Sequence, residues 1–271
     1  MRQLYGRHAL VTGGAMGMGK SLSRLLLLEG MKVTIIDINE DELEKTCSEL
    51  SGLGHITSHV CDVSDRKAVN ALADFMDKDY GGIDLLVNNA GIAESQPLIE
   101  KSDLIIEKTI AVNLLSHFWT IKAFLPGMIE RGRGHIVNMA SAAGILGVPY
   151  ISDYSASKFG DVGLSESLRQ ELRLTGRGFI RVTYVCPSTV GTGMFEGNTP
   201  VTGTRILDQD EVAARMVTAI KRNREKVFIP AFLHTGAVLK SILPVPAMDL
   251  ITRLLGVATC SANMTGRQAQ A

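Results

Sequence analysis

The chain has 271 residues, of which 45% are apolar and 21% charged, and its 28 basic and 28 acidic side chains give a formal net charge of zero. This length and composition suit one large α/β domain with a real core, and the lack of a basic stripe argues against nucleic acid as a partner. Four scattered cysteines without a Cys-x-x-Cys pair, and histidines without ligand spacing, argue against a disulfide scaffold or a metal site and fit a reducing cytoplasm: Cys47, Cys61, Cys186 and Cys260.

The first predicted strand begins within a few residues of Met1, which leaves no room for a signal peptide. The longest apolar stretch, Val227 to Leu239, contains Pro230 and His234 and falls short of the ~20 residues that a membrane span needs. We therefore expect a soluble, cytoplasmic protein without a membrane span.

The predicted elements begin with a strand, a glycine turn and a helix. His8–Thr12 is a short apolar run, Gly13, Gly17 and Gly19 follow it, and a helical pattern continues to about Glu29. Glycines let the backbone turn tightly and approach a pyrophosphate, which binds at the positive end of the helix. Alone, such a cluster is equally consistent with a plain turn, but its place between strand and helix indicates the start of a doubly wound fold.

The second predicted strand, Lys32–Ile36, ends in Asp37. An acidic residue at this strand end accepts both hydroxyls of an adenosine ribose and repels a 2′-phosphate. No arginine stands in the glycine loop or directly after Asp37, so NAD is the expected cofactor. The alternative, Asp37 as a cap for the helix predicted over 41–50, is weaker because Asn39 fills that role.

Further strands and helices alternate along the rest of the chain. The strands are predicted over 55–60, 83–87, 134–139, 180–185 and 226–229, and the helices from Ser64, over 102–131, over 153–175 and over 208–223. This order predicts a single-domain, Rossmann-type doubly wound α/β fold of about seven parallel strands with helices on both faces.

Tyr154 and Lys158 are four residues apart on the helix predicted over 153–175. Side chains at this spacing share a helix face. A lysine ammonium beside a phenol lowers the pKa of the phenol, and a unit charge at ~4 Å supplies the roughly 4 kcal/mol needed to bring that pKa from ~10 toward neutrality. Ser141 lies at the carboxyl end of the strand predicted over 134–139, where open parallel sheets bind ligands.

These residues, together with Thr12-Gly-Gly-Ala-Met-Gly-Met-Gly19 and Asn88-Asn-Ala-Gly91, resemble the short-chain dehydrogenase/reductase family from about residue 7 to about 230. The resemblance implies four catalytic residues: Asn113, Ser141, Tyr154 and Lys158. It implies cofactor contacts from Gly13, Met16, Gly17, Met18, Gly19, Asp37, Asp62, Val63, Asn89, Ala90, Gly91, Tyr154, Lys158, Pro187, Val190 and Thr192.

Individual roles follow from the same resemblance. Asp62 would receive the adenine amino group with Val63 beside the ring, although a cap for the helix from Ser64 is an equally good interpretation. Asn113 would sit in a local helix distortion and hold a water in line with Lys158; a solvated helix asparagine is the alternative. Ser188 departs from the glycine usual after Pro187, which puts the backbone path there in doubt.

For alcohol oxidation, Tyr154 would act as general base, Lys158 would stabilise its phenolate and bond the nicotinamide ribose, and Ser141 would donate to the substrate oxygen. The same set serves a reductase of 3-oxoacyl thioesters or a dehydrogenase of small ketones and polyols. A non-catalytic cofactor-binding sensor is a further alternative, but such relatives are expected to lose the tyrosine or the lysine.

Residues 193–207 contain many Gly, Thr and Pro and are predicted to form a mobile substrate loop. The C-terminal extension, residues 230–267, resembles the retinol-dehydrogenase-like branch through Leu239-Lys-Ser-Ile-Leu-Pro244 and Gly266-Arg267. Its apolar surface must cover a subunit neighbour, a membrane face contacted peripherally, or a substrate cleft. We expect it to wall a pocket for a retinoid, steroid or long-chain alcohol. The resemblance also implies a homodimer or homotetramer, with Trp119 and Phe159 as contacts.

Overall fold

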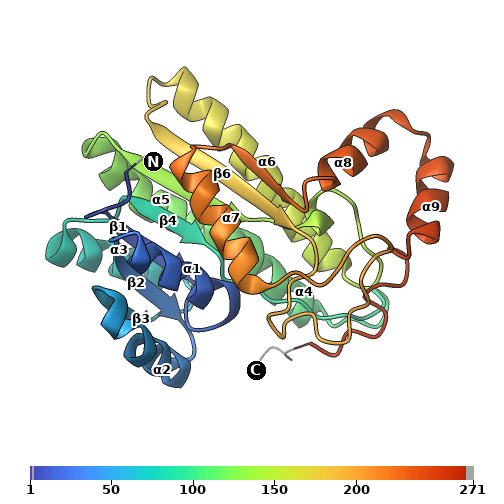
Figure 1. Ribbon diagram of the computed structural model, residues 1–271, viewed down its shortest axis with the longest axis horizontal. Coiled ribbons are helices and arrows are strands. Elements are labelled where there is room, and N and C mark those ends of the chain that lie inside the picture. Colours follow the sequence, from blue (N-terminus) through green and yellow to red (C-terminus); the bar gives the residue numbers. More distant parts are fainter. Residues whose placement is uncertain (2, 267–271) are drawn as a thin grey trace.

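The computed structural model describes residue 1 and residues 3–266 of the chain. Its centre is a seven-stranded parallel sheet in the order β3-β2-β1-β4-β5-β6-β7 (Figure 1). The strands are β1 (His8–Thr12), β2 (Lys32–Asp37), β3 (Ile56–Val60), β4 (Leu85–Asn88), β5 (Gly134–Met139), β6 (Ile180–Pro187) and β7 (Lys226–Ile229). The strand order reverses between β1 and β4, and a doubly wound sheet binds its ligand at such a point.

Helices cover both faces of the sheet, as predicted. The helices are α1 (Gly17–Leu28), α2 (Glu40–Leu50), α3 (Arg66–Tyr80), α4 (Asp103–Ile110), α5 (Ser116–Glu130), α6 (Ser152–Leu174), α7 (Gln209–Lys221), α8 (Leu233–Ile242) and α9 (Val245–Leu254). One core cluster joins α1, α2 and α7 to the sheet, and a second joins α3, α5 and α6 to the other face.

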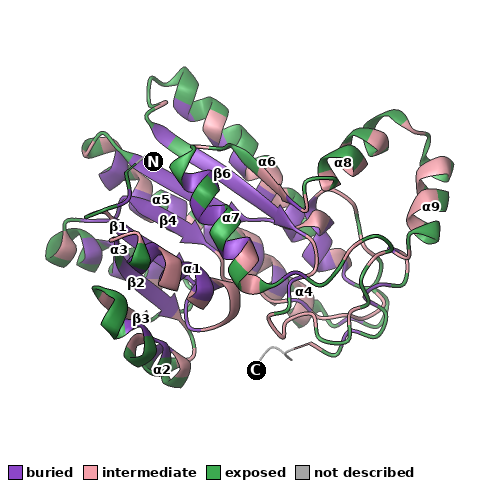
Figure 2. Ribbon diagram, in the orientation of Figure 1, coloured by how far each residue is buried: buried purple, intermediate pink, exposed green. Residues whose placement is uncertain are grey.

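The strands explain why two cores form. Neighbouring side chains of a strand point to opposite faces, so Val11 of β1 lies in one cluster and Leu10 in the other. Val87 and Leu86 of β4 divide in the same way. Because both faces are buried, the central strands consist almost entirely of buried residues (Figure 2).

Two helical segments differ from the sequence prediction. The helix expected over 102–131 is interrupted by a π-helical turn, Ala111–Leu115, between α4 and α5. The helix expected from Ser64 begins at Arg66, because Asp65 is its N-cap and its carboxylate accepts from the Lys67 backbone N–H. The strand after it begins at Leu85 rather than at residue 83, and β6 continues through Pro187.

The C-terminal extension leaves the sheet after β7 and forms α8 and α9 on one side of the molecule. Neither helix contributes a buried residue. Residues 255–266 then return to the substrate loop, and Arg267 lies outside the described residues. No helix in the described part of the chain combines the length and apolarity needed to span a bilayer.

Candidate active site

The glycine loop forms a close-fitting cradle at the start of α1. A Cβ atom on Gly19 would lie 2.0 Å from the carbonyl oxygen of Gly13, and one on Gly13 would lie 2.8 Å from the Cα of Ala90. Met16 is the N-cap of α1 and offers no side-chain cap, and Met18 lies in the first turn. An uncapped helix N-terminus behind a tight glycine turn suits a pyrophosphate, so the loop fits a dinucleotide cofactor.

Asp37 ends β2 directly beside this loop. Its Oδ2 accepts from the Ala15 backbone N–H at 3.3 Å, and its Oδ1 accepts from Ile38 and Asn39 at 2.9 and 3.3 Å. The cap of α2 is Asn39, whose side chain accepts from the Glu42 backbone N–H. Asp37 is therefore not needed as that cap, and its carboxylate lies where the adenosine ribose of a cofactor would be expected.

The Asn88–Gly91 segment joins neighbouring strand ends. Asn88 donates to Asn138 of β5 at 2.9 Å, and the Asn89 amide donates to the carbonyl oxygens of Thr12 and Gly13 at 2.9 and 3.1 Å. The backbone N–H groups of Asn89 and Ala90 both donate to the Thr12 hydroxyl. The side chain of Asn89 thus fixes the glycine loop, and the small Ala90 and Gly91 leave the backbone open beside it.

Asp62 and Val63 follow β3. The Asp62 Oδ1 accepts from the backbone N–H and the hydroxyl of Ser64, so Asp62 closes a turn and does not cap α3. Val63 is buried in the core cluster beneath α3. The carboxylate of Asp62 is therefore accessible to a ligand, whereas the side chain of Val63 is buried in the core.

The π-helical turn brings Asn113 into the site. Asn113 is fully buried, its Oδ1 accepts from the Ile92 N–H at 2.8 Å, and its Nδ2 donates to the Ile92 carbonyl at 2.9 Å. The same Nδ2 donates to the Ser157 hydroxyl at 3.2 Å. The amide therefore ties the segment after Gly91 to α6. It is already bonded to protein groups, so a solvated helix asparagine is not what the structure shows.

Tyr154 lies on the first turn of α6, next to Ser141. Its ring is buried, and its hydroxyl shares a hydrogen bond with the Ser141 side chain. Burial raises the pKa of Tyr154 above its ordinary value, while the Lys158 charge and the Ser141 bond lower it without offsetting the burial. The expectation that one ammonium brings Tyr154 toward neutrality is wrong for the protein chain by itself, because desolvation of a buried phenolate dominates.

Lys158 is held by two acceptors. Its Nζ donates to the Met139 carbonyl at 2.7 Å and to the Asp161 Oδ2 at 3.0 Å, and it lies 5.7 Å from the centre of the Tyr154 ring. Sequence reasoning did not select Asp161, although a carboxylate three residues beyond Lys158 shares its helix face. His117 of α5 reaches the same carboxylate, because its Nδ1 lies 2.7 Å from the Asp161 Oδ1.

A second buried ion pair involves Asp153, the residue directly before Tyr154. Lys101 donates to Asp153 at 2.6 Å and to the Glu94 carbonyl at 2.8 Å, and neither charged side chain is more than 1% exposed. The pair joins the loop before α4 to the first turn of α6. It holds the backbone of the residue directly before Tyr154.

The segment after β6 closes over the glycine loop. Pro187 ends β6, Val190 is buried and forms a β-bridge with Leu207, and a Cβ atom on Gly17 would lie 3.2 Å from the Thr192 Cβ. Ser188 donates its backbone N–H to the Ile229 carbonyl at 2.7 Å and has no positive φ angle. The backbone path at Ser188 therefore accepts a side chain, and the departure from glycine does not disturb it.

Apolar side chains surround the Tyr154 ring. Ala93, Ala143 and Ile151 pack with it from the main fold, Met194 and Phe195 from the substrate loop, and Met264 from the C-terminal segment. The C-terminal segment is bonded to the loop, because Thr199 donates to Cys260 at 2.9 Å and Thr265 donates to Glu196 at 2.8 Å. The extension thus contributes directly to the walls around Tyr154.

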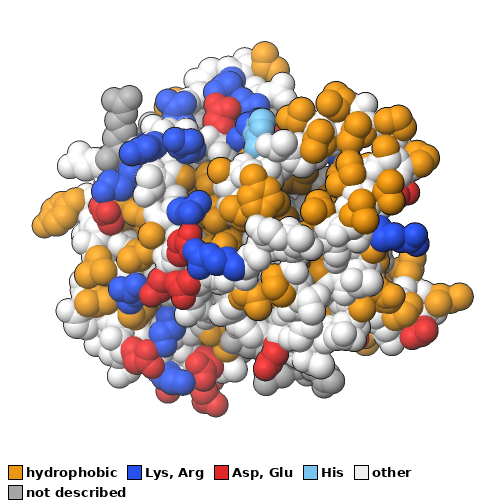
Figure 3. Space-filling model, turned by 45° about the vertical axis from the view of Figure 1, so that its right-hand side comes forward, with side chains coloured by type: hydrophobic (Ala, Val, Ile, Leu, Met, Phe, Trp, Pro, Cys, Tyr) orange, Lys and Arg blue, Asp and Glu red, His pale blue; other side chains and the backbone are white. Residues whose placement is uncertain are grey.

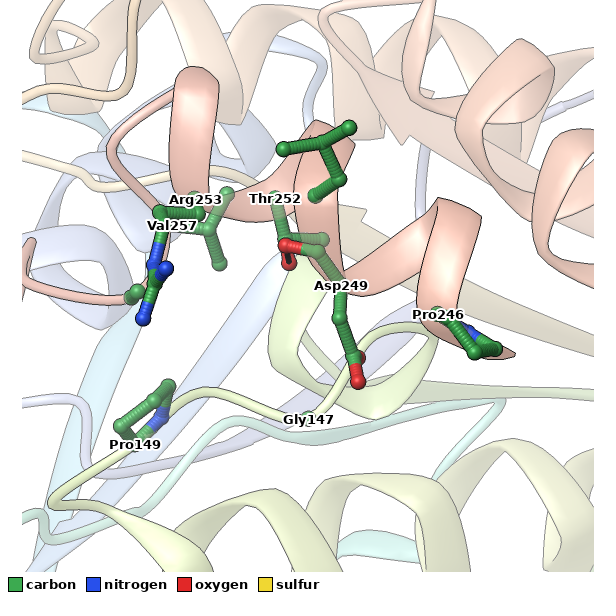
Figure 4. A pocket seen from close by; sticks show the side chains of 9 residues that line it. Gly147, Pro149, Pro246, Asp249, Thr252, Arg253 and Val257 are labelled. Atoms are coloured by element: carbon green, nitrogen blue, oxygen red, sulfur yellow. Dashed lines mark hydrogen bonds between the residues drawn. The ribbon is translucent and has the colours of Figure 1, made fainter. Parts of the chain in front are cut away.

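A groove of about 550 Å³ lies beside this apolar wall (Figure 4). It is lined by Gly147, Pro149, Pro246, Asp249, Leu250, Thr252, Arg253, Val257 and Ala258. Gly147 and Pro149 face the groove, whereas Val148 between them packs against the Tyr154 cluster. Residues 147–149 therefore contribute both to the groove and to the apolar cluster around Tyr154.

Known proteins are similar to this chain in sequence and in fold. The family model described as short chain dehydrogenase matches residues 7–201. Epidermal retinol dehydrogenase 2 of Mus musculus is 35% identical over 98% of this chain and 88% of its own length, and estradiol 17-beta-dehydrogenase 11 of Homo sapiens is 34% identical over 94% and 85%. The crystal structure of a short chain dehydrogenase/reductase from Burkholderia phymatum in complex with NAD has a TM-score of 0.82 and 28% identity, covering 93% of this chain and 97% of that one.

The similarity to the retinol dehydrogenase covers 98% of this chain and 88% of that protein. The chain therefore belongs to the short-chain dehydrogenase family and is an oxidoreductase that interconverts alcohols and carbonyls with a nicotinamide cofactor.

Proposed function

We propose that this enzyme oxidises the alcohol group of an apolar, lipid-like substrate with NAD, or reduces the matching carbonyl. The observation that carries the proposal is the buried Tyr154, bonded to Ser141, adjoined by Lys158 and enclosed by apolar side chains from the substrate loop and the C-terminal segment. The extension, the loop and the main fold act as one catalytic domain in this proposal.

In the oxidation direction, the phenolate of Tyr154 takes the proton of the substrate alcohol. Ser141 donates a hydrogen bond to the same oxygen, where charge develops as the hydride leaves. A bound nicotinamide supplies the acceptor for that hydride. Lys158 stabilises the phenolate and bonds the ribose of the cofactor, and in the reduction direction Tyr154 returns the proton.

Asn113 supports this chemistry through the backbone. Its amide is bonded to Ile92 and Ser157, so the side chain fixes the wall of the site. A π-helical turn breaks the regular i to i+4 bonding of the helix. We infer that a backbone carbonyl in this turn, rather than the amide, anchors the water that exchanges protons with Lys158.

The apolar character of the substrate rests on the walls around Tyr154 and on the relatives. Two of those relatives are named for retinol and for estradiol, and both of these substrates are apolar alcohols. A panel of retinol, a steroid and decanol against acetoin and short polyols tests the proposal. Higher kcat/KM for the small polar substrates would show that the extension is structural and does not bind substrate.

The choice of NAD rests on Asp37. Its carboxylate lies beside the glycine loop, and residues 13–18 and 38–39 contain no arginine to neutralise a 2′-phosphate. A phosphate group there would meet a negative charge at short range, whereas ribose hydroxyls would donate to it. Measuring kcat/KM with NAD and with NADP decides between them, and a preference for NADP would refute this assignment.

A homodimer or homotetramer formed through α5 and α6 completes the proposal. Trp119 is not a good contact, because it packs into the core beside α3 and the Arg66 guanidinium lies over its ring. Leu115 and Phe118, four residues and one residue before Trp119, are exposed, as is Phe159 of α6. Sedimentation that shows only monomer at micromolar concentration would contradict this part.

Apolar side chains also gather over α8 and α9 (Figure 3). The helix α8 is attached to the active-site segment, because the Lys240 Nζ donates to the Ile145 carbonyl at 2.7 Å and lies 4.4 Å from the centre of the Phe159 ring. We propose that α8 and α9 flank the route by which an apolar substrate reaches Tyr154. The same route would remain open if the outer face of α8 and α9 contacted a membrane surface.

A further inference from the structure

Lys158 and Asp161 form a charge pair that is almost completely removed from water. The lysine side chain is 3% exposed and the aspartate side chain is not exposed, and their Nζ and Oδ2 atoms are 3.0 Å apart. An ammonium group has three N–H donors. Two of them donate to Asp161 and to the Met139 carbonyl, which leaves one donor for the cofactor ribose and the Tyr154 oxygen.

The second oxygen of Asp161 is fixed from a different helix. The Asp161 Oδ1 lies 2.7 Å from the Nδ1 of His117 on α5, which is within ion-pair distance although the ring is not aligned for a full hydrogen bond. His117 is buried as well. The carboxylate is therefore held between α5 and α6, and it cannot turn away from Lys158 without losing its contact with His117.

The charge of Asp161 acts on both catalytic groups. Burial by itself would lower the pKa of Lys158, but the Asp161 carboxylate and Tyr154 outweigh it and raise that pKa. Burial is the main cause of the raised pKa of Tyr154, and the charge of Asp161 adds to it. The other titratable side chain that faces them is Cys186 of β6, whose pKa burial raises to about 12, so that it stays an uncharged thiol at neutral pH.

We propose that Asp161, braced by His117, is a positioning residue for the reaction: its carboxylate aims the Lys158 ammonium and offsets part of the positive charge that acts on Tyr154. This inference rests on the proposed role of Tyr154 as general base. It adds to the reaction centre a residue that touches neither the substrate nor the reacting atoms.

The test compares the pH dependence of kcat/KM for alcohol oxidation in the parent and in Asp161→Asn, which keeps the shape and removes the charge. Loss of the negative charge stabilises the Tyr154 phenolate, so the pH at which activity rises should fall. The expected fall is about one pH unit, and a fall of about half a unit is the smallest that supports the inference. Glu171→Gln on the exposed side of α6 is the matched control and should leave the profile unchanged. The binding of NAD, followed by fluorescence, should stay within threefold of the parent in both variants.

Ultraviolet titration of the phenolate separates this inference from the proposed function. The signal of Tyr154 is obtained by subtracting a Tyr154→Phe variant, and it should move with the kinetic profile. If Tyr154→Phe keeps its turnover, the proposed role of Tyr154 is wrong. If that variant is inactive but the profile of Asp161→Asn does not move, or moves to higher pH, Asp161 does not tune the site and the inference is overturned.

Asp161→Ser provides a second neutral variant, because its short side chain leaves space for a water beside Lys158. It should shift the profile in the same direction. If both neutral variants fail to fold by circular dichroism, the pair with Lys158 is structural and the inference is also overturned.

Discussion

The buried pair of Lys101 and Asp153 offers a quantitative test of how the start of α6 is held. With 2.6 Å between Nζ and Oδ1, an effective dielectric constant of ~20 gives an attraction of about 6 kcal/mol. Desolvation of the two charges offsets part of it. Removing one partner of a buried pair typically costs about 3–5 kcal/mol, because the other charge stays buried and unpaired.

Lys101→Met should therefore lower the free energy of unfolding by about 4 kcal/mol and the melting temperature by about 10 °C. Urea unfolding at pH 7 measures the first quantity and calorimetry the second. The matched control is Lys221→Met, which removes a lysine from an exposed pair with Glu29 at 2.8 Å. That change should cost less than about 1 kcal/mol.

The double variant Lys101→Met with Asp153→Asn removes both charges. It should be more stable than Lys101→Met alone, because no unpaired charge remains at the buried site. A loss below about 1 kcal/mol in Lys101→Met, or a double variant less stable than the single one, would refute the reasoning. Either result would mean that water reaches the pair and that the start of α6 is held by other contacts.

Three further predictions concern the site. Tyr154→Phe should reduce kcat by more than about a thousandfold with NAD affinity nearly unchanged, since the ring still packs but carries no exchangeable proton; turnover within tenfold of the parent contradicts the mechanism. Asp37→Ala should lower the ratio of kcat/KM with NAD to kcat/KM with NADP by about tenfold or more. The variant loses both the bond to the ribose hydroxyls and the repulsion of the 2′-phosphate, and an unchanged ratio would exclude Asp37 as the residue that selects NAD. Met264→Ala should raise KM for decanol by about tenfold, from loss of apolar contact, while leaving KM for a short ketone within twofold; equal effects on both would show that Met264 only holds the loop.

The sequence predicted the arrangement of the sheet well because each strand is a short apolar run between strong turn signals. β1, β5 and β7 begin and end at the predicted residues. The alternation of strands and helices predicted the parallel sheet with helices on both faces, but no order of the strands was predicted. The interruption at Asn113 was implied by the family resemblance, and the π-helical turn over Ala111–Leu115 agrees with it.

Other features depend on tertiary contacts that no local pattern contains. The amide of Asn113 bonds to Ile92, 21 residues away, and His117 meets Asp161 across two helices. The balance of charges at Tyr154 likewise depends on burial, which a spacing of four residues between Tyr154 and Lys158 does not express. The resemblance suggested Trp119 as an interface contact, but its neighbour Phe118 is the exposed one.

The hydrogen bonds between the substrate loop and the C-terminal segment have a consequence for protein engineering. Thr199, Thr202 and Thr265 join two stretches that are more than fifty residues apart in the chain. If the loop alone were exchanged between two relatives, it would lose its hydrogen-bond partners in residues 255–266. Chimeras designed to transfer substrate preference should therefore exchange residues 193–207 and 255–266 together, as one cassette.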